Sequence, residues 1–337
     1  MLAAPHLRRA GALTAAAAAT FALATPAQAA PSAEDRFAGR ASAGWLARQF
    51  VDGTHLQTDF GGSSYDDPGL TLDAVLAFAA AKTNARHSDA ALTWLGNPST
   101  LGGYIGTGSE SYAGAHAKLA LTLQVTGADA RAFGGRNIIA ELVALQENSG
   151  RLSDASQWGD YSNAFGQSFG TIALKRAGLA ARANSAAGYL QSQACADGGV
   201  PITFETAPCT SDADATALAI QAFAATGRTS AATRAGNWLT AYVKGNESLN
   251  ANTAGLAAAA LDLTRSPAAA TARAQVRSKQ QGCATPFARR AAIAFTLPYD
   301  AAAAPRATAQ GILGLGGAKL ASLTSRGSIA FAPTLTC

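Results

Sequence analysis

Two aspartates separated by one residue come nearest to a catalytic motif in this chain. Asp212 and Asp214 lie in residues 211–217, which read SDADATA. A carboxyl group can donate a proton to a substrate when burial or a like-charged neighbour keeps it neutral. Asp214 is therefore a candidate proton donor, with Asp212 as its flanking carboxylate.

The same aspartates have a structural interpretation, which the residues favour. They stand where a polar turn runs into an Ala-rich helical stretch, and Ser and Asp at a helix N-cap contribute about 1 kcal/mol. The helix dipole there favours the ionised carboxylate and so lowers its pKa. Helix capping is therefore predicted ahead of proton donation, and ligand contact is a third interpretation. Comparable places in other helical stretches are occupied by Ser111, Ser162 and Asn252.

A second set of candidates combines acids with aromatic rings ahead of other helical stretches. Paired carboxylates about 5 to 9.5 Å apart are what glycoside hydrolysis needs, and aromatic platforms suit sugar rings. Glu110 and Asp160 are the pair that could act in this way. Loops at helix starts are polar in any barrel, so a solvated rim is the alternative. The predicted ligand-binding residues are Asp67, Glu110, Tyr112, His116, Trp158, Asp160, Tyr161 and Gln167.

The histidines give little support for metal chemistry. His116 is expected on an inner helix, as are Gln167, Arg306 and Gln310, and all four could reach a central cavity. A lone His among small residues is more often a hydrogen-bonded core residue than a base. The histidines after residue 30 are scattered singly, so we predict no metal site and no cofactor.

The four cysteines predict two disulfides in an exported chain. We favour Cys195 with Cys209, which closes one loop, and Cys283 with Cys337, which ties the C-terminal tail to the body. Closing a loop of about 14 residues contributes roughly 3 kcal/mol in the chain-entropy model. Their predicted role is stabilisation.

The elements that carry these residues form a repeat. A polar turn followed by an Ala-rich helical stretch recurs, and the stretches end near Gly127, Gly178 and Gly227, which are 51 and 49 residues apart. A period of about 50 residues holds two helices and their turns. The copies begin at Asp67, Ser111, Ser162, Asp212, Asn252 and Arg306.

Between the copies lie amphipathic stretches with a single apolar stripe, such as residues 235–242, which are expected to be outer helices. The Ala-rich stretches are apolar or small on nearly every face, as residues 254–261 show, so they are expected to be inner helices. Six such pairs predict an all-α fold, an (α/α)6 toroid, with an open solenoid as the alternative. All inner helices then start at one rim.

Residues 293–297 and 328–331 are predicted to form a minor hairpin or a packed tail.

The N-terminal residues predict export. Residues 1–29 contain Arg8 and Arg9, an apolar run and the small-residue site Ala27-Gln28-Ala29, as in a secretory signal peptide. Residues 30–337 are then predicted to form a single secreted domain with no membrane span. Removing the two arginines lowers the net charge from +5 to +3. That weak excess does not indicate a nucleic-acid partner.

The chain resembles the terpenoid-cyclase and protein-prenyltransferase α/α-toroid superfamily. The likeness rests on residues 189–199, YLQSQACADGG, followed by Asp212-x-Asp214-x-Thr216-Ala217-Leu218. It implies a toroid with a cavity rather than a particular reaction, since the superfamily also includes complement-type thioester domains and cobalamin carriers. Prenyltransferases of this kind carry an Asp-x-Cys zinc signature, which this chain lacks. Of the thioester pattern Gly-Cys-Gly-Glu-Gln it shares only Gly282-Cys283.

The closest motif is that of the squalene-hopene-type cyclases, Asp-x-Asp-Asp-Thr-Ala. The resemblance implies that Asp214 would protonate an alkene or epoxide beside Asp212, but Ala215 stands where the motif has its third Asp. Those cyclases also add a second helical domain that encloses the substrate, and this chain contains no such domain.

Because each catalytic signature is incomplete, the sequence favours capture of a small-molecule, glycan or protein ligand at the rim where the inner helices begin. The alternative is an enzyme of the same fold. It would be either a terpene-cyclase-like lyase that uses Asp214, or a carbohydrate-active hydrolase or lyase that uses rim carboxylates.

Overall fold

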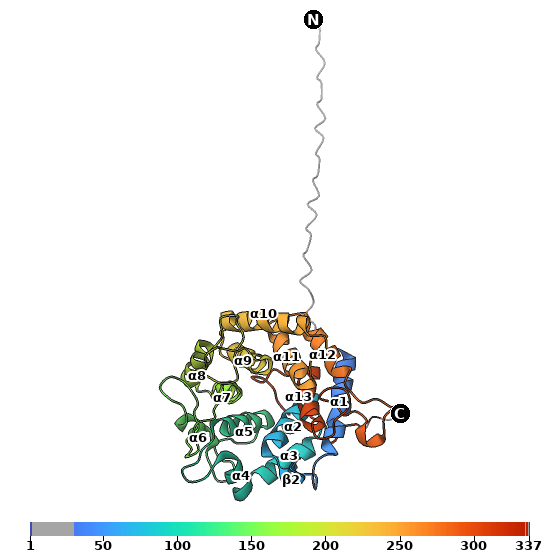
Figure 1. The fold of residues 1–337 in the computed structure, drawn as a ribbon, viewed down its shortest axis with the longest axis horizontal. Helices are drawn as coiled ribbons and strands as arrows, with labels where there is room; N and C mark the ends of the chain where they lie inside the picture. Colours follow the sequence, from blue (N-terminus) through green and yellow to red (C-terminus); the bar gives the residue numbers. More distant parts are fainter. Residues whose placement is uncertain (2–29, 334, 336) are drawn as a thin grey trace.

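The helices form two concentric rings (Figure 1) in the computed structural model, which describes Met1, residues 30–333, Leu335 and Cys337. Each inner helix contacts the next, and the last contacts the first, so the ring is closed. The toroid predicted from the repeat is therefore confirmed, and the open solenoid is excluded. The inner helices are α2 (Pro68–Ala81), α5 (Ala113–Thr126), α7 (Ala164–Arg176), α9 (Ala213–Ala225), α11 (Ala251–Leu263) and α13 (Ala304–Leu315).

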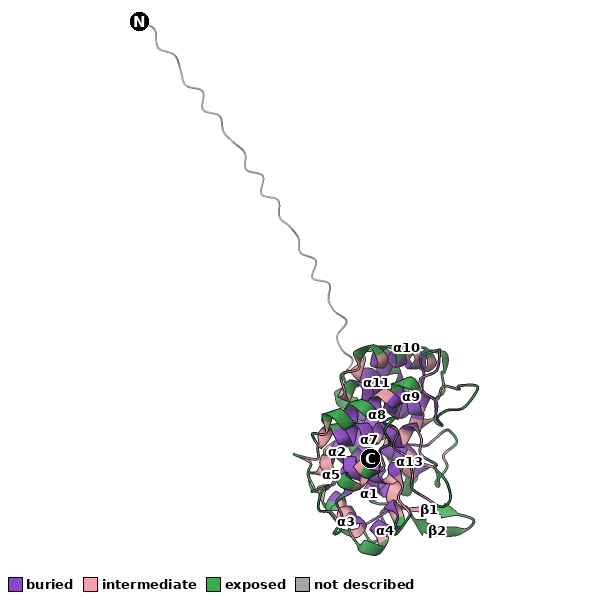
Figure 2. Ribbon diagram, turned by 90° about the vertical axis from the view of Figure 1, so that its left-hand side faces the viewer, coloured by how far each residue is buried: buried purple, intermediate pink, exposed green. Residues whose placement is uncertain are grey.

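The outer helices differ from the inner ones in burial, as their composition predicts (Figure 2). In α11 every residue from 253 to 262 is buried, whereas α10 buries residues spaced by three or four positions, from Ala232 to Val243. An amphipathic helix covers the core with one stripe, and a helix buried on all sides is surrounded by protein. The outer ring consists of α1 (Ala33–Ala47), α3 (Ala85–Leu95), α6 (Ile138–Ala144), α8 (Ala180–Ser192), α10 (Thr229–Gly245) and α12 (Ala268–Arg277).

Two elements that the repeat does not predict lie near the start of α2. Strands β1 (Gln57–Phe60) and β2 (Ser63–Asp66) form an antiparallel hairpin that projects from the molecule (Figure 2). The short helix α4 (Pro98–Ile105) lies between α3 and α5. Of the two alternatives for residues 293–297 and 328–331, the hairpin is not formed among the described residues. Residues 328–331 instead pack on the body as a tail, where the Ile329 N–H donates to the Lys82 carbonyl and the Ile329 carbonyl accepts from the Ala85 N–H. Ile293 makes only an isolated bridge with Gln280, and η1 (Phe287–Arg289) is the other short element there.

Polar side chains cap five of the inner helices at one rim, but not always at the predicted residue, and α13 begins without a side-chain cap. Asp212 Oδ1 accepts a hydrogen bond from the Ala215 N–H at 2.8 Å and so caps α9. The caps of α7 and α11 are Asn163 and Asn250, rather than Ser162 and Asn252. Helix α5 is capped from another loop, where Asp154 Oδ1 accepts from the Ala113 N–H at 2.7 Å, and Ser111 takes no part.

Both predicted disulfides, Cys195–Cys209 and Cys283–Cys337, are present. Disulfides of this kind fit an oxidising, extracellular environment. No helix of the described residues has the length and apolar character needed to cross a membrane. The predicted signal peptide, residues 1–29, lies outside the described residues apart from Met1.

Small residues allow the inner helices to approach closely, and Gly255 is the tightest example. A Cβ atom at Gly255 in α11 would lie 2.3 Å from the Gln310 carbonyl oxygen in α13, which is closer than atoms can approach. Gly255→Ala must therefore push α13 outward, and we expect a loss of about 1 to 3 kcal/mol in the free energy of unfolding, measured by chemical denaturation.

The matched control is Gly103→Ala in α4, where nothing lies within 4 Å of an added Cβ. That change should be neutral or should stabilise the protein by about 0.4 to 1 kcal/mol, because alanine restricts the unfolded chain. Equal effects at the two positions would contradict the packing argument.

Candidate active site

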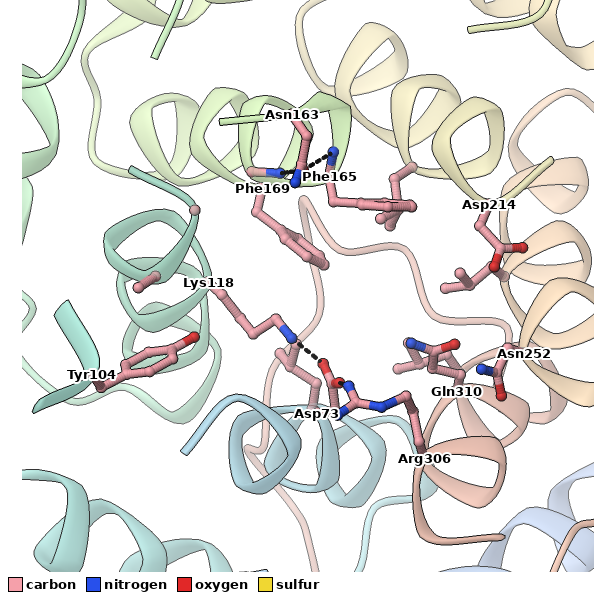
Figure 3. A pocket seen from close by; sticks show the side chains of 17 residues that line it. Asp73, Tyr104, Lys118, Asn163, Phe165, Phe169, Asp214, Asn252, Arg306 and Gln310 are labelled. Atoms are coloured by element: carbon pink, nitrogen blue, oxygen red, sulfur yellow. Dashed lines mark hydrogen bonds and ion pairs between the residues drawn. The ribbon is translucent and has the colours of Figure 1, made fainter. Parts of the chain in front are cut away.

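A cavity of about 390 Å³ lies at the centre of the toroid (Figure 3). All of the inner helices contribute side chains to its wall, and Tyr104 of α4 adds an aromatic ring. Because the first turns of these helices line the cavity, the capped rim described above is also its mouth. Concave sites with a few convergent polar groups are the usual places for ligand binding and catalysis.

Asp214, in the first turn of α9, lies in this wall. Burial raises the pKa of Asp214 to about 6; a hydrogen bond from the Thr253 side chain lowers it and the nearby Asp212 raises it. At mildly acidic pH the carboxyl group is therefore protonated. The helix dipole favours the ionised form and would lower this pKa, but burial outweighs that effect.

Next to Asp214 the wall carries two amide side chains, Asn252 of α11 and Gln310 of α13 (Figure 3). The Asp214 Oδ1, Asn252 Oδ1 and Gln310 Oε1 atoms are buried and have no hydrogen-bond partner within the described residues. A buried acceptor without a partner costs about 1 to 3 kcal/mol, so three on one wall need an explanation. The three side chains that carry these atoms all line the cavity.

The opposite wall is ionic (Figure 3). Asp73 of α2 is buried and pairs through Oδ1 with Lys118 Nζ at 2.8 Å and through Oδ2 with Arg306 Nη1 at 3.2 Å. Arg306 also pairs with the α2 cap Asp67 at 3.1 Å. The sequence analysis did not select Asp73 or Lys118. Each of the two could have been identified in the sequence as a charged residue in the middle of an otherwise apolar inner helix.

Aromatic rings complete the wall. Phe165 and Phe169 of α7 lie on one side, and Tyr104 lies beside Lys118 (Figure 3). Burial raises the pKa of Tyr104 well above its usual value, with further increases from Asp73 and Asp67, so its hydroxyl stays neutral. Tyr104 also borders a second, more open hollow of about 460 Å³ beside the β1–β2 hairpin.

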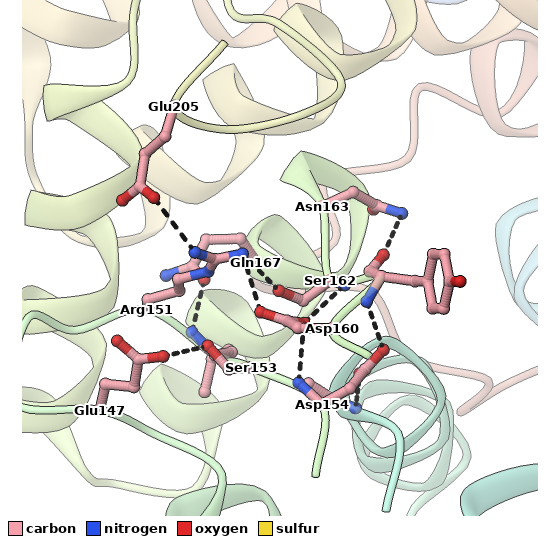
Figure 4. Close-up of polar contacts among 12 residues, drawn as sticks. Glu147, Arg151, Ser153, Asp154, Asp160, Ser162, Asn163, Gln167 and Glu205 are labelled. Carbon is pink, nitrogen blue, oxygen red and sulfur yellow. Dashed lines mark hydrogen bonds and ion pairs between the residues drawn. The ribbon is translucent and has the colours of Figure 1, made fainter. Parts of the chain in front are cut away.

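The predicted carboxylate pair Glu110 and Asp160 is not part of this cavity. Asp160 accepts hydrogen bonds from the N–H groups of Asp154 and Ser162 at 3.0 and 2.9 Å and pairs with Arg151 at 2.8 Å (Figure 4). Burial would raise the pKa of Asp160, but these hydrogen bonds and the arginine lower it below its usual value. Asp160 is thus an ionised residue that organises a loop.

Glu110 has a similar structural role. Hydrogen bonds from the Ser156 side chain and the Gln157 N–H lower the pKa of Glu110. It borders a separate hollow with Arg136 and Glu141. Glu110 and Asp160 therefore both have hydrogen-bond partners in nearby loops, and their action as a catalytic pair stays a prediction.

His116 and Gln167 also lie away from the cavity. His116 is buried, with Nε2 at 2.9 Å from the outer-helix residue Glu141 and Nδ1 at 2.9 Å from the Tyr112 carbonyl oxygen. Gln167 is buried, accepts from the Leu152 N–H at 2.8 Å and donates to the carbonyls of Gly150 and Ala186. Both residues join layers of the core, which corrects the expectation that they face a ligand.

The other predicted rim residues are dispersed. Trp158 and Tyr161 are 71% and 75% exposed on the loop before α7, and Tyr112 donates a weak hydrogen bond to Glu110 at 3.4 Å. Asp67 borders the hairpin hollow and reaches the cavity through Arg306, while Asp212 caps α9. Of the residues expected to reach a cavity or a ligand, Asp214, Arg306 and Gln310 line the central cavity, and Asp67 contacts it through Arg306.

This arrangement can bind a polar molecule and protonate it. Asp214, with its raised pKa, lines the cavity together with Asn252 and Gln310, and the ion-paired carboxylate of Asp73 and several aromatic and leucine side chains complete the lining. In the part of the chain that the structure describes, no group of three His, Cys, Asp or Glu side chains could hold a metal ion.

Comparisons with known proteins place the fold. No family model and no curated protein matches this sequence. A crystal structure of a protein from Actinoplanes is similar, with 15% identity and a TM-score of 0.59 over 84% of this chain and 99% of that one. An inactive variant of an α-1,6-mannanase of Salegentibacter, in complex with α-1,6-mannotriose, has 9% identity and a TM-score of 0.60 over 86% and 99% of the two chains.

An unsaturated glucuronyl hydrolase specific for heparin is also similar, with 10% identity and a TM-score of 0.56 over 84% of this chain and 96% of that one. At such low identities the likeness is one of fold. Together with the closed double ring of helices, it identifies this protein as an α/α toroid.

Proposed function

We propose that this protein is a carbohydrate-active enzyme that binds a saccharide in the central cavity and uses Asp214 as its proton donor. The observation that carries the proposal is the wall on which a buried carboxyl with a raised pKa lies beside the unpaired acceptors of Asn252 and Gln310. The proposal adopts the enzymatic alternative from the sequence analysis, with Asp214 in place of Glu110 and Asp160.

A saccharide fits this wall because each sugar ring carries several hydroxyl donors. After rotation about their soft terminal torsions, the acceptors would receive hydrogen bonds from the hydroxyl groups of a bound sugar. A ligand without hydroxyls would leave them unpaired at the cost noted above. The rings of Phe165, Phe169 and Tyr104 offer apolar faces for the C–H surfaces of a sugar. The saccharides named with two of the similar structures give further support.

In the proposed reaction, protonated Asp214 gives its proton to the glycosidic oxygen while the bond from that oxygen to the anomeric carbon breaks. Water then adds to the carbon, and its proton restores the Asp214 carboxyl, so atoms and charge balance. Positive charge develops on the sugar ring in such reactions. Asp73, held by Lys118 and Arg306, would stabilise that charge from the opposite wall.

A cyclase-like function of Asp214 is a second candidate, because four leucines also line the cavity. Leu76, Leu218, Leu256 and Leu313 would suit an isoprenoid chain. An isoprenoid carries no hydroxyl donor along its chain, however, and alkene protonation demands a stronger acid than protonation of a glycosidic oxygen. Both points favour a saccharide substrate over an isoprenoid.

One panel experiment separates these functions. Purified protein is incubated at pH 5 with α-1,6-manno-oligosaccharides, unsaturated uronate oligosaccharides and isoprenoid diphosphates, and products are followed by mass spectrometry alongside thermal shift. Saccharide cleavage is the expected result. Isoprenoid turnover would instead establish the cyclase, and saturable binding without any turnover would return the protein to the ligand-capture function that the sequence favoured.

We further infer that the protein acts outside the cell after removal of residues 1–29. The two disulfides support an oxidising compartment. N-terminal sequencing of the protein from culture medium should find a start near Ala30, and an intact N-terminus in the cell pellet would contradict export.

A further inference from the structure

We infer that the hollow beside the β1–β2 hairpin is a second sugar-binding subsite, which takes the next units of a neutral oligosaccharide whose reacting unit lies in the central cavity. This inference rests on the proposed function and extends it, because it makes the substrate a chain rather than a single sugar. We call this hollow the hairpin subsite; Phe60, Tyr65, Pro68 and Tyr104 give its apolar surface.

The hairpin subsite adjoins the central cavity. Tyr104 lines both hollows and therefore lies at the boundary between them. The ring packs beside Gly69 in the first turn of α2, where an added Cβ would lie 3.8 Å from Tyr104 Cε2. With volumes of about 390 and 460 Å³, each hollow is of the size that holds a small ligand. A chain that passes Tyr104 would occupy both.

The register of the hairpin determines which side chains face the subsite. Thr58 pairs with Tyr65, and Phe60 pairs with Ser63. Residues two apart on a strand share a face, so Thr58, Phe60 and Tyr65 lie on one face, and that face borders the hollow. The other face carries Asp59 and Ser64, which hydrogen bond to each other at 2.5 Å. The hairpin therefore presents an aromatic face to the subsite and a polar face away from it.

This aromatic face is held in place although it is exposed. Phe60 and Tyr65 are 79% and 58% exposed, which leaves large apolar surfaces in water. A two-stranded hairpin alone is marginally stable, but here Thr58 Oγ1 donates to Asp67 Oδ2 at 2.7 Å. His55 Nε2 lies 2.9 Å from Asp66 Oδ1, and the His55 ring stacks on Trp94 at 4.4 Å.

Such anchoring preorganises a binding surface and so reduces the entropy lost on binding. It also links the two hollows, because the Asp67 Oδ2 atom that holds Thr58 also holds Arg306.

The chemistry of the subsite favours a neutral chain. Its carboxylates are already engaged, Asp66 by His55 and Gln57, and Asp67 by Thr58, Arg306 and the Leu70 N–H. Among the residues that the structure describes, no lysine or arginine lines the subsite to hold an anionic sugar. Apolar rings with few available polar groups bind the C–H faces of neutral sugar rings.

The test measures how affinity depends on chain length. Manno-oligosaccharides of two to six α-1,6-linked units are titrated calorimetrically into the Asp214→Asn protein, in which turnover is removed. We expect affinity to increase at least about 10-fold from the shortest to the longest chain. Adding Phe60→Ala and Tyr65→Ala should remove that increase.

Phe37→Ala, at an exposed aromatic of α1 away from the rim, is the matched control and should keep the length dependence. Phe60→Leu keeps the apolar bulk without the ring and should lose most of the increase. A length dependence that survives the Phe60 and Tyr65 changes would overturn the hairpin subsite alone. If none of the oligosaccharides binds to any of these proteins, the proposed function fails, and this inference fails with it.

Discussion

Replacing Asp214 by asparagine should reduce the rate of saccharide cleavage at least about 1,000-fold, because the change removes the proton that the leaving oxygen needs. Asparagine has the same shape, so the cavity is retained. The pKa of Asp214 is raised by burial, which means that its ionisation destabilises the folded protein. The neutral variant should therefore be at least as stable as the parent at pH 7. Product formation and the midpoint of thermal unfolding check the two expectations.

The pH dependence follows from the same carboxyl. A general acid must be protonated, so kcat/KM should fall as the pH rises through about 6, the pKa of Asp214. Asp212→Asn is the matched control. Asparagine caps a helix as well as aspartate, so stability should change little, and loss of the neighbouring charge should lower the pKa of Asp214 and move the fall in activity to lower pH.

An Asp214→Asn protein with full activity would remove this residue from the mechanism, and so would a profile that rises between pH 5 and 7.

The largest expected effect on stability comes from Arg273→Met. The Arg273 side chain in α12 is 1% exposed, and its Nη1 lies 3.0 and 2.9 Å from the two carboxylate oxygens of Asp262 in α11. Its Nε lies 3.5 Å from Asp35 in α1, so one guanidinium joins three helices of the two rings. Breaking a buried ion pair by removing one partner typically costs about 3 to 5 kcal/mol. Urea denaturation at pH 7 measures the loss.

The loss should depend on pH. Burial raises the pKa of Asp262 and Arg273 lowers it, so removing the arginine should raise this pKa further. A carboxyl with a raised pKa in the folded protein costs stability when it ionises, so the variant should regain stability as the pH falls from 7 to 5.

Arg277→Met on the same helix is the control. Arg277 is 28% exposed and pairs with the exposed Glu34 and with Asp35. Asp35 keeps Arg273 and the Ser32 N–H as partners when Arg277 is removed, so the loss should be smaller, about 1 to 2 kcal/mol. Equal losses for the two variants would show that burial of Arg273 is unimportant.

The part of the fold predictable from sequence was the part governed by local rules. Residues 253–262 are small or apolar on every face, and a helix with no polar face must be surrounded by protein. The stripe in α10 identified an outer helix for the converse reason. Hairpin β1–β2 and helix α4 escaped prediction because they are short and interrupt the repeat, so the periodicity gave no signal for them.

The candidate site was predictable only in part. Asp214 could be selected because it stands at the start of an inner helix, and the resemblance to the cyclase motif points to the same residue. Asp73 and Lys118 lie 45 positions apart and meet only because α2 and α5 are neighbours in the closed ring. Like Asp214, Glu110 and Asp160 stand near the starts of inner helices in the sequence. In the structure, their carboxylates accept hydrogen bonds from backbone N–H groups of nearby loops.

By itself, the sequence determined the pairing of helices, their inner and outer positions and the rim at which the inner helices begin, because these depend on periodicity, residue size and capping within each repeat. Only the tertiary structure decided which acid is buried, since the pKa of Asp214 depends on walls contributed by residues from all parts of the chain. Ring closure brings α13 against α2 and Arg306 against Asp73, 233 residues away. The charge, shape and unpaired acceptors of the cavity result from those long-range contacts.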